Sequence, residues 1–385
     1  MKEKARQKAT LALADGSLFP GVAWGAEGRT VGEVVFTTGM TGYQEVLTDP
    51  SYAGQMVTMT APHIGNTGVN HEDPESRDEK PQLTGFIVRA PSPTPSSWRA
   101  TESLDAYMKR HGLVAISGVD TRALTRYLRD KGSQNGCIGT GDPASLVDAA
   151  RAAPNMDGLD LVAQVTPKER YAFGEDRAAW RVPFDPTAPF TGEGKVTRDK
   201  PYNVVAMDFG AKRNILRCLV DVGCRVTAVP ASTSASDILA LSPDGIFLSN
   251  GPGDPAAIDY AVRTIRELLG KKPIFGICLG HQLLGLALGA RTYKLKFGHR
   301  GLNQPVKDLE TGRVEITTQN HGFVVDVDSI GKGARSTHLH LNDGTSEGIA
   351  VPDASAFSVQ YHPEAAAGPH DALYLFSRFT AAMEG

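Results

Sequence analysis

The residues best suited to covalent chemistry in this chain are a cysteine and its two neighbouring glycines, in Gly276-Ile277-Cys278-Leu279-Gly280-His281-Gln282. The apolar run Pro273-Ile274-Phe275 precedes it and a second apolar run follows it, which is typical of a strand, a sharp turn and a helix. Glycine tolerates the crowding on either side of such a turn. A helix start also favours a thiolate, because its N–H groups and positive dipole end face the side chain. The position of Cys278 therefore predicts a nucleophile.

A nucleophilic thiol needs a base, and the base needs an orienting group. The sequence Tyr361-His362-Pro363-Glu364 follows a strand-like run at 356–360 and offers both. A histidine and a carboxylate two residues apart at a strand end point the same way, since side chains alternate along a strand. We therefore expect Glu364 to bond one ring nitrogen of His362 and to leave the other nitrogen facing Cys278.

The same chemistry needs backbone N–H donors for the oxyanion of a tetrahedral intermediate. The N–H of Leu279 at the helix start and the backbone of Gly251-Pro252-Gly253 are candidates. Gln282 lies one helical turn beyond Cys278, where it can meet a polar substrate, and Asn320-His321-Gly322-Phe323 is a second polar loop containing glycine.

Other cysteines and histidines receive simpler interpretations. Cys137, Cys218 and Cys224 are expected to be inert core residues. Cys278 and His281 have a spacing seen in metal sites, but no second ligand pair accompanies them, so we predict no metal. His338 and His340 alternate on a predicted strand and are interpreted as surface residues.

Buried strands alternate with helices through the second half of the chain. The predicted strands are 203–207, 224–229, 245–248 and 273–277, and the predicted helices are those around 215–220, 235–241, 258–269 and 279–288. Continuous apolar strands alternating with helices predict a parallel sheet covered on both faces. Ligands bind at the carboxyl ends of such strands. Cys278 and the loop 250–255 are both placed at such ends.

The first half of the chain is β-rich. Residues 31–38 and 55–60 have the composition of strands, and Asp120 to Arg129 is predicted to be a helix capped by Asp120 and ended by Gly132. Residues 183–201 are rich in proline, glycine and charge, and predict a linker. The fold class is therefore α/β, with an N-terminal domain over 1–182 and a C-terminal, mostly parallel-sheet domain over 202–385.

The motifs at Cys278 and at His362-Pro363-Glu364 resemble those of the class I, triad-type glutamine amidotransferases. Within that group the chain resembles the family of small, glutamine-hydrolysing subunits of carbamoyl-phosphate synthase. The resemblance runs from about residue 11 to the C-terminus. It also rests on 40–45, 47–52, 62–66, 208–215, 249–255 and 297–301.

The resemblance implies a fold, an activity and a set of residues. Glutamine is cleaved to glutamate and ammonia through a thioester on Cys278, with His362 as general acid/base and Glu364 as its partner. The residues implied to hold L-glutamine are Ser51, Gly251, Gly253, Leu279, Gln282, Asn320, Gly322 and Phe323. Ammonia passes to a large subunit, which forms a heterodimer with this chain, binds ATP and Mg²⁺, and makes carbamoyl phosphate for arginine and pyrimidine biosynthesis.

Composition limits the remaining function classes. The chain has 385 residues, 41% hydrophobic and 22% charged, with a net charge of −3 and no strongly basic block, so nucleic-acid binding is not indicated. No apolar run reaches the length of a membrane span. Four scattered cysteines favour a reducing cytoplasm. The glycines in 192–197 have the wrong spacing for a phosphate loop, so the nucleotide is expected on the partner and no cofactor on this chain.

Two alternatives stay open at this point. One is another enzyme of the same kind, either a free-standing glutaminase or an amidotransferase serving a different synthase. The other is a catalytically silent regulatory or binding subunit with the same fold, although the presence of Cys278, His362 and Glu364 argues against it.

Overall fold

The computed structural model describes residues 7–178, 200–331 and 333–384. It divides into two compact units, Met1–Leu159 and Asp160–Gly385. The predicted linker at 183–201 lies outside the described residues except at its last two positions, so that prediction stays a prediction. Residues 160–178, which the sequence assigned to the first domain, belong to the second unit.

The early boundary has a physical reason. The short strand β10 (Tyr171–Phe173) pairs antiparallel with β12 (Cys224–Pro230) at the edge of the second unit's sheet. Four residues further on, the guanidinium of Arg177 lies 2.5 Å from the carboxylate of Asp221, and both side chains are buried. These two contacts attach the segment to the second unit.

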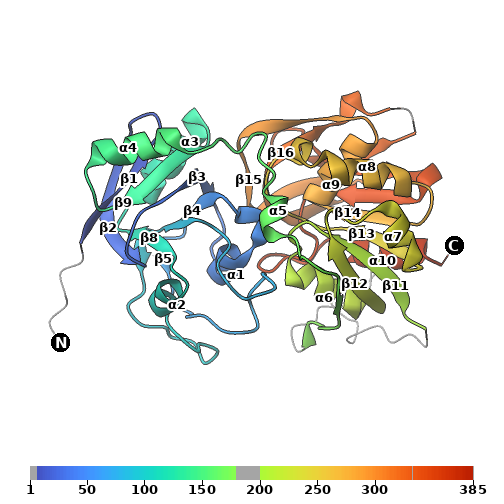
Figure 1. Cartoon of the computed structure of the whole chain (residues 1–385), viewed down its shortest axis with the longest axis horizontal. Coiled ribbons are helices and arrows are strands. Elements are labelled where there is room, and N and C mark those ends of the chain that lie inside the picture. Colours follow the sequence, from blue (N-terminus) through green and yellow to red (C-terminus); the bar gives the residue numbers. More distant parts are fainter. Residues whose placement is uncertain (1–6, 179–199, 332, 385) are drawn as a thin grey trace. The chain divides into compact units, whose positions relative to one another are not determined.

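A closed β-barrel forms the first unit, shown in blue to green in Figure 1. Its strand order is β1-β2-β8-β6-β4-β3-β9, with parallel pairing from β8 through β6 and β4 to β3 and antiparallel pairing elsewhere. The strands are β1 (Lys8–Leu13), β2 (Leu18–Gly25), β3 (Thr30–Thr37), β4 (Gln55–Met59), β6 (Gly85–Ile87), β8 (Val114–Ser117) and β9 (Gln134–Gly139).

Helices and short elements surround this barrel. They are α1 (Tyr43–Thr48), α2 (Leu104–Arg110), α3 (Thr121–Lys131), α4 (Pro143–Ala152), the 3₁₀ turn Pro50–Tyr52 and the small parallel pair β5 (His63–Ile64) and β7 (Ala90–Pro91). The predicted caps of α3 are confirmed: the Asp120 carboxylate accepts from the N–H of Ala123 at 2.9 Å, and Gly132 ends the helix. The predicted strands at 31–38 and 55–60 correspond to β3 and β4.

The second unit is built on a ten-stranded sheet of order β10-β12-β11-β13-β14-β19-β18-β17-β15-β16. The predicted parallel sheet is confirmed in its centre, where β12, β11 (Tyr202–Asp208), β13 (Gly245–Leu248), β14 (Ile274–Ile277) and β19 (Ala356–Val359) pair in parallel. The helices are α5 (Val162–Val165), α6 (Arg213–Asp221), α7 (Ala235–Ala240), α8 (Asp259–Leu268), α9 (Leu279–Ala287) and α10 (Tyr374–Ala382).

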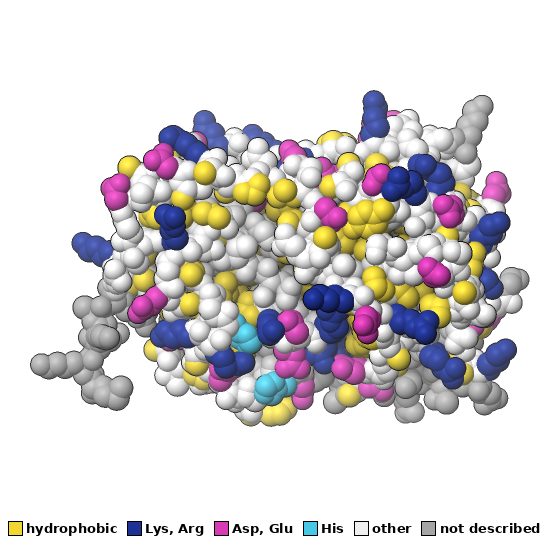
Figure 2. All heavy atoms as spheres, in the orientation of Figure 1, with side chains coloured by type: hydrophobic (Ala, Val, Ile, Leu, Met, Phe, Trp, Pro, Cys, Tyr) yellow, Lys and Arg dark blue, Asp and Glu magenta, His cyan; other side chains and the backbone are white. Residues whose placement is uncertain are grey.

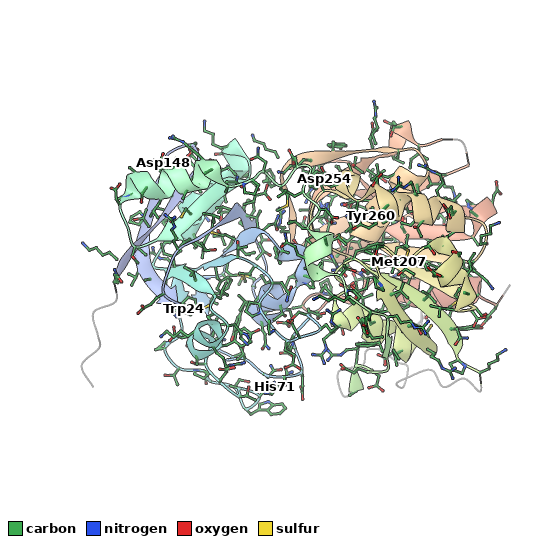
Figure 3. All side chains as sticks on the ribbon, in the orientation of Figure 1. Trp24, His71, Asp148, Met207, Asp254 and Tyr260 are labelled. Atoms are coloured by element: carbon green, nitrogen blue, oxygen red, sulfur yellow. The ribbon has the colours of Figure 1, made fainter. Side chains whose placement is uncertain are left out.

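Side-chain alternation along the parallel strands places apolar residues on both faces. On β11, Val204 and Ala206 join one core cluster with α6 and α10, whereas Val205 and Met207 join the other with α7, α8 and α9. Figure 3 labels Met207 on β11 and Tyr260 on α8. The sheet is thus covered on both faces, and its strand ends are the places left for chemistry.

The antiparallel half of the sheet was not predicted. It consists of β18 (Ser346–Val351), β17 (Arg335–His340), β15 (Arg291–Asp308) and β16 (Val314–Asp326), all paired antiparallel. The long pair β15 and β16 shifts register twice, between Lys294 and His299 and again between Gly301 and Gln304. Such irregularities bend strands and redirect side chains.

Two surface properties agree with the sequence. Lysine, arginine, aspartate and glutamate side chains are interspersed over the face shown in Figure 2, and no single-sign patch dominates that face. Among the residues described, helices are all too short or too polar to span a lipid bilayer.

Candidate active site

Cys278 lies between the last residue of β14 and the first residue of α9, as predicted. Its backbone has φ 54° and ψ −104°, a conformation that costs a non-glycine residue roughly 1–3 kcal/mol. Its N–H donates to the carbonyl of Val359 at 2.9 Å, and its carbonyl accepts from the N–H of Gln282 at 3.1 Å. These two bonds hold the strained turn in place.

The glycines beside Cys278 are required by close backbone approach. A Cβ on Gly276 would lie 2.9 Å from the backbone of Gly280, and one on Gly280 would lie 2.2 Å from the carbonyl oxygen of Leu248. The neighbouring strand β13 therefore packs directly on the turn. The turn needs glycine at both positions for steric reasons.

His362 and Glu364 interact as predicted. Nδ1 of His362 lies 2.7 Å from Oε1 of Glu364, and both side chains are buried. Burial by itself would lower the pKa of His362, but the charge of Glu364 and the interaction of the ring with Cys278 outweigh it and raise the pKa to about 10. The structure thus brings Cys278, His362 and Glu364 together.

Lys212 completes this group and received no role from the sequence. Its ammonium lies 2.9 Å from Oε1 of Glu364 and donates to the carbonyl of Ala365 at 3.1 Å. Its backbone N–H bonds the side chain of Asn250, and the amide of Asn214 bonds the carbonyl of Glu364. These residues lie in the motifs 208–215 and 249–255, directly after the adjacent parallel strands β11 and β13, and that placement was the available signal.

The thiol also contacts one of the predicted substrate loops. Sγ of Cys278 donates to the carbonyl of Asn320 at 3.7 Å, and the Gln282 amide donates to the carbonyl of Phe323 at 2.7 Å. The second donor contact of Gln282 is Oε1 of Gln360 at 3.1 Å. The amide nitrogen of Gln282 therefore connects strand β16 to the residue that follows β19.

The remaining predicted glutamine-binding residues have different placements. Gly251 packs against the site, since a Cβ there would lie 2.8 Å from the Leu279 side chain. Gly253 follows in the same loop with φ 90°, one residue before Asp254, which Figure 3 labels. Gly322 lies on β16 between Asn320 and Phe323. Ser51 lies in the first unit, where its N–H bonds the Asp49 carboxylate, and its role in binding substrate stays a prediction.

The expectation that His338 and His340 are surface residues is wrong. Their exposed fractions are 2% and 1%. Strand β17 lies between β18 and β15 inside the sheet, and side chains of the second unit pack on both histidines. The ring of His340 stacks on His299 at 4.2 Å, and the ring of His338 packs edge-on against Tyr361.

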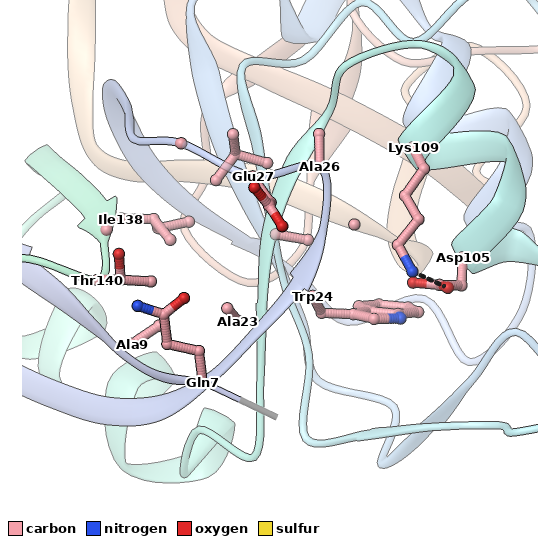
Figure 4. Close-up of a pocket in the computed structure, with 15 residues that line it drawn as sticks. Gln7, Ala9, Ala23, Trp24, Ala26, Glu27, Asp105, Lys109, Ile138 and Thr140 are labelled. Atoms are coloured by element: carbon pink, nitrogen blue, oxygen red, sulfur yellow. Dashed lines mark hydrogen bonds and ion pairs between the residues drawn. The ribbon is translucent and has the colours of Figure 1, made fainter. Parts of the chain in front are cut away.

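A separate pocket of about 610 Å³ lies in the first unit, between the strands of the barrel and α2 (Figure 4). Its polar lining includes Glu27 and the ion pair between Lys109 and Asp105. None of its lining residues is a cysteine or a histidine. This pocket therefore offers neither the thiol nor the imidazole that the predicted chemistry needs.

Comparisons with known proteins cover nearly the whole chain. Residues 11–138 match the family described as the carbamoyl-phosphate synthase small chain, CPSase domain, and residues 205–382 match the class I glutamine amidotransferases. The chain is similar to two proteins named carbamoyl phosphate synthase small chain. The one from Syntrophotalea carbinolica is 59% identical over 98% of each chain, and the one from Pseudomonas aeruginosa is 55% identical over 97% of this chain and 98% of that one. The match to a solved glutamine amidotransferase structure from Thermotoga maritima covers 48% of this chain and 85% of the solved chain. Its sequence identity is 18% and its TM-score is 0.35, a likeness too distant to support an argument.

Proposed function

This chain belongs to the carbamoyl phosphate synthase small chain family, and we propose that it releases ammonia from L-glutamine at Cys278 for use by a separate large subunit. ATP and Mg²⁺ are then bound by that subunit, which makes carbamoyl phosphate for arginine and pyrimidine biosynthesis. The two chains form a heterodimer in the cytoplasm. The amidotransferase of another synthase is the alternative, and the match over residues 11–138 favours the first assignment.

One observation carries the proposal. Cys278 lies at a strained turn at the carboxyl end of a parallel strand. Beside it is a buried series of contacts, in which His362 bonds Glu364 and Glu364 bonds Lys212. Such an arrangement of nucleophile, base and orienting carboxylate suits acyl transfer. A silent regulatory subunit has no need of it.

In the proposed mechanism Cys278 reacts as a thiolate, and the proton of its thiol is held on Nε2 of His362, whose raised pKa of about 10 keeps the ring charged at neutral pH. The sulfur then attacks the side-chain amide carbon of glutamine, and a tetrahedral oxyanion forms. The N–H of Leu279 and the backbone of the 251–253 loop stabilise that oxyanion. His362 next protonates the leaving nitrogen, ammonia departs, and a γ-glutamyl thioester remains on Cys278.

Hydrolysis of the thioester completes the cycle. His362 takes a proton from water, and the resulting hydroxide attacks the thioester carbon. The carbon–sulfur bond then breaks, and the Cys278 sulfur and His362 again share one proton, as at the start of the cycle. Glu364 holds the His362 ring in one orientation and stabilises its charged form throughout. We assign glutamine binding to Ser51, Gly251, Gly253, Leu279, Gln282, Asn320, Gly322 and Phe323.

Replacing the nucleophile tests the proposal. In Cys278→Ser we expect ammonia release from glutamine to fall at least about a thousandfold, because a hydroxyl is a poorer nucleophile in a site built for a thiol. Carbamoyl phosphate synthesis from free ammonia by the complex with the large subunit should survive. The matched control is Cys224→Ala, another buried cysteine, which should keep glutamine hydrolysis.

Two results would overturn the assignment. Full glutamine-dependent activity in Cys278→Ser would remove Cys278 from the reaction. Purification of the chain with a different ATP-using synthase, and without a carbamoyl phosphate synthase large subunit, would favour the alternative.

A further inference from the structure

Two histidines and a glutamate converge inside the antiparallel half of the second unit's sheet. His299 is on β15, His321 on β16 and Glu347 on β18, and all three are buried. Nδ1 of His299 lies 3.7 Å from Oε1 of Glu347, and Nε2 of His321 lies 3.9 Å from the same oxygen. The three candidate ligand atoms all lie within 4.8 Å of one another.

Two of these atoms have no hydrogen bond in the described part of the chain. They are Nδ1 of His299 and Oε1 of Glu347, both buried. The 3.7 Å between them is too long for a hydrogen bond. Buried polar atoms are nearly always satisfied by a protein partner, by water or by an ion, so a water molecule or an ion is expected between these two atoms.

Hydrogen bonds on the far side of each ring decide which nitrogen carries its proton. The carboxylate of Asp343 lies 2.7 Å from Nε2 of His299, which places the proton on Nε2 and a lone pair on Nδ1. The carbonyl of Phe323 lies 3.0 Å from Nδ1 of His321, which places the proton there and a lone pair on Nε2. Both lone pairs are then on the ring nitrogens that lie 3.7 Å and 3.9 Å from Oε1 of Glu347.

The surroundings of His321 strengthen the case for a cation. Besides Glu347, the amide oxygen of Gln319 lies 3.0 Å from Nε2 of His321. A neutral ring donates only one hydrogen bond, so one of its two acceptor partners, Phe323 or Gln319, must face a lone pair. The Gln319 amide cannot reverse without turning its oxygen toward Glu347, whose Oε2 accepts from it at 3.1 Å. A bound cation removes this conflict.

We propose that a divalent transition-metal ion, with zinc as the best fit, binds between Nδ1 of His299, Nε2 of His321 and Oε1 of Glu347. Imidazole nitrogen and carboxylate oxygen are ligands that Zn²⁺ prefers, and the Gln319 oxygen lies beside the fourth position. Bonds of about 2.1 Å in a tetrahedral site separate ligand atoms by roughly 3.4 Å. The distances of 3.7 Å and 3.9 Å from Oε1 of Glu347 to the two ring nitrogens therefore need to shorten by only a few tenths of an ångström.

The supporting contacts are those that metal ligands typically have. Metal-binding histidines usually donate their other N–H to a carboxylate or a backbone carbonyl, as His299 does to Asp343 and His321 to Phe323. Metal-binding carboxylates are usually hydrogen-bonded in turn, as Glu347 is by Gln319.

A second group shares His299 but fits an ion less well. It consists of His299, His340 and Asp343. Nε2 of His299 already bonds Asp343, and Nδ1 of His340 accepts from the N–H of Asn342 at 3.2 Å. Neither His340 nor Asp343 has a buried side-chain nitrogen or oxygen without a hydrogen bond in the described structure. The side chain of Asp343 is also 38% exposed, so this second group is open to solvent on that side.

The bound ion would fix the strand that borders the cysteine. Phe323, whose carbonyl orients His321, also accepts the amide of Gln282, and the preceding Asn320 accepts the thiol of Cys278. Metal binding is measured without any reaction of glutamine, so the proposal stands or falls independently of the proposed function.

Metal titration of the full chain tests the proposal. After removal of metals with a chelator, we expect one Zn²⁺ per chain by calorimetry and elemental analysis, and Co²⁺ should give the strong visible absorption of a tetrahedral site. Glu347→Gln keeps the shape of the side chain but loses the charged ligand, so the affinity for Zn²⁺ should fall at least about a hundredfold. Asp343→Asn should lower the affinity for Zn²⁺ about 10–100-fold, because Asp343 orients the His299 ring. His71→Gln, an exposed position in the first unit, should change nothing.

His340→Gln separates the two groups. We expect it to retain the ion, because only the second group uses His340. Loss of the ion in His340→Gln with retention in Glu347→Gln would overturn the proposal, and so would the absence of stoichiometric binding in the original chain. Thermal unfolding checks that each variant folds, and His321→Asn replaces Glu347→Gln if the latter does not, because His321 belongs to the first group alone.

Discussion

The ammonium of Lys212 lies 2.9 Å from Oε1 of Glu364, the oxygen that also bonds the imidazole of His362. Both members of this ion pair are almost fully buried. Burial by itself would raise the pKa of Glu364, but the charges of Lys212 and His362 outweigh it and lower the pKa to about 2. Lys212 therefore keeps Glu364 ionised, which Glu364 needs in order to orient His362.

Lys212→Met is expected to damage both stability and catalysis. Removal of one partner leaves a buried charge uncompensated, which typically costs about 3–5 kcal/mol of unfolding free energy. The weaker hold on His362 should also lower kcat for glutamine hydrolysis. Urea denaturation and ammonia release measure the two effects.

The matched control is Lys109→Met, whose ammonium pairs with Asp105 at the surface. Exposed pairs contribute little, so we expect a change below about 1 kcal/mol. Equal losses in the two variants would contradict a special role for the buried pair.

Gly280→Ala is expected to disrupt the turn at Cys278. The added methyl would lie 2.2 Å from the carbonyl oxygen of Leu248, and backbone on neighbouring strand β13 cannot move aside cheaply. Overpacking of this kind costs about 1–3 kcal/mol, and the displaced nucleophile should lose most of its activity. Gly174→Ala, which meets nothing within 4 Å, should change unfolding free energy by less than about 0.5 kcal/mol. Unchanged activity in Gly280→Ala would show that the turn tolerates a side chain.

The catalytic part of the site was predictable because its signals are local. The strand, turn and helix around Cys278 follow from the apolar runs and the two glycines within a few residues. The contact between His362 and Glu364 follows from their spacing of two residues at a strand end. Patterns of a few adjacent residues predict local backbone conformation, and that conformation is what places these side chains.

The supporting contacts were not predictable, because they join residues distant in sequence. Lys212 and Glu364 are 152 positions apart, and only the pairing of the parallel strands brings them together. His340 was misplaced for a related reason. An alternating strand looks like a surface strand, but its burial depends on the neighbours β18 and β15, which its own residues do not specify.

The stability of the fold should depend on pH through His362. Its pKa is raised from 6.5 to about 10 in the folded chain, so the folded state binds this proton more tightly than the unfolded state. The resulting stabilisation is complete below about 6.5 and is lost as pH rises through about 10. Glu364 contributes no pH dependence in this window, because its stabilisation is already complete above its usual pKa of 4.5 and is lost only as pH falls toward its lowered pKa of about 2.

The comparison that isolates this effect is between the original chain and His362→Gln. We expect the difference in unfolding free energy, measured with urea across that pH window, to shrink as pH rises. A difference that stays constant or grows would mean that the folded state does not hold the His362 proton.

The four cysteines should react very unequally with a glutamine-shaped electrophile such as its chloroketone analogue. All four are buried, so exposure does not distinguish Cys278 from Cys137, Cys218 and Cys224. Cys278 interacts with His362 as a base, and among the four cysteines, all of which the structure describes, it alone has a positive φ. We therefore expect mass spectrometry of the folded chain to find modification at Cys278 alone, while all four thiols react after unfolding. His362→Gln should slow the labelling about 10²–10⁴-fold, the usual contribution of a general base. Labelling of Cys224 at a similar rate, or no labelling of Cys278, would favour a catalytically silent subunit, because such a chain has no reason to keep one thiol activated inside its core.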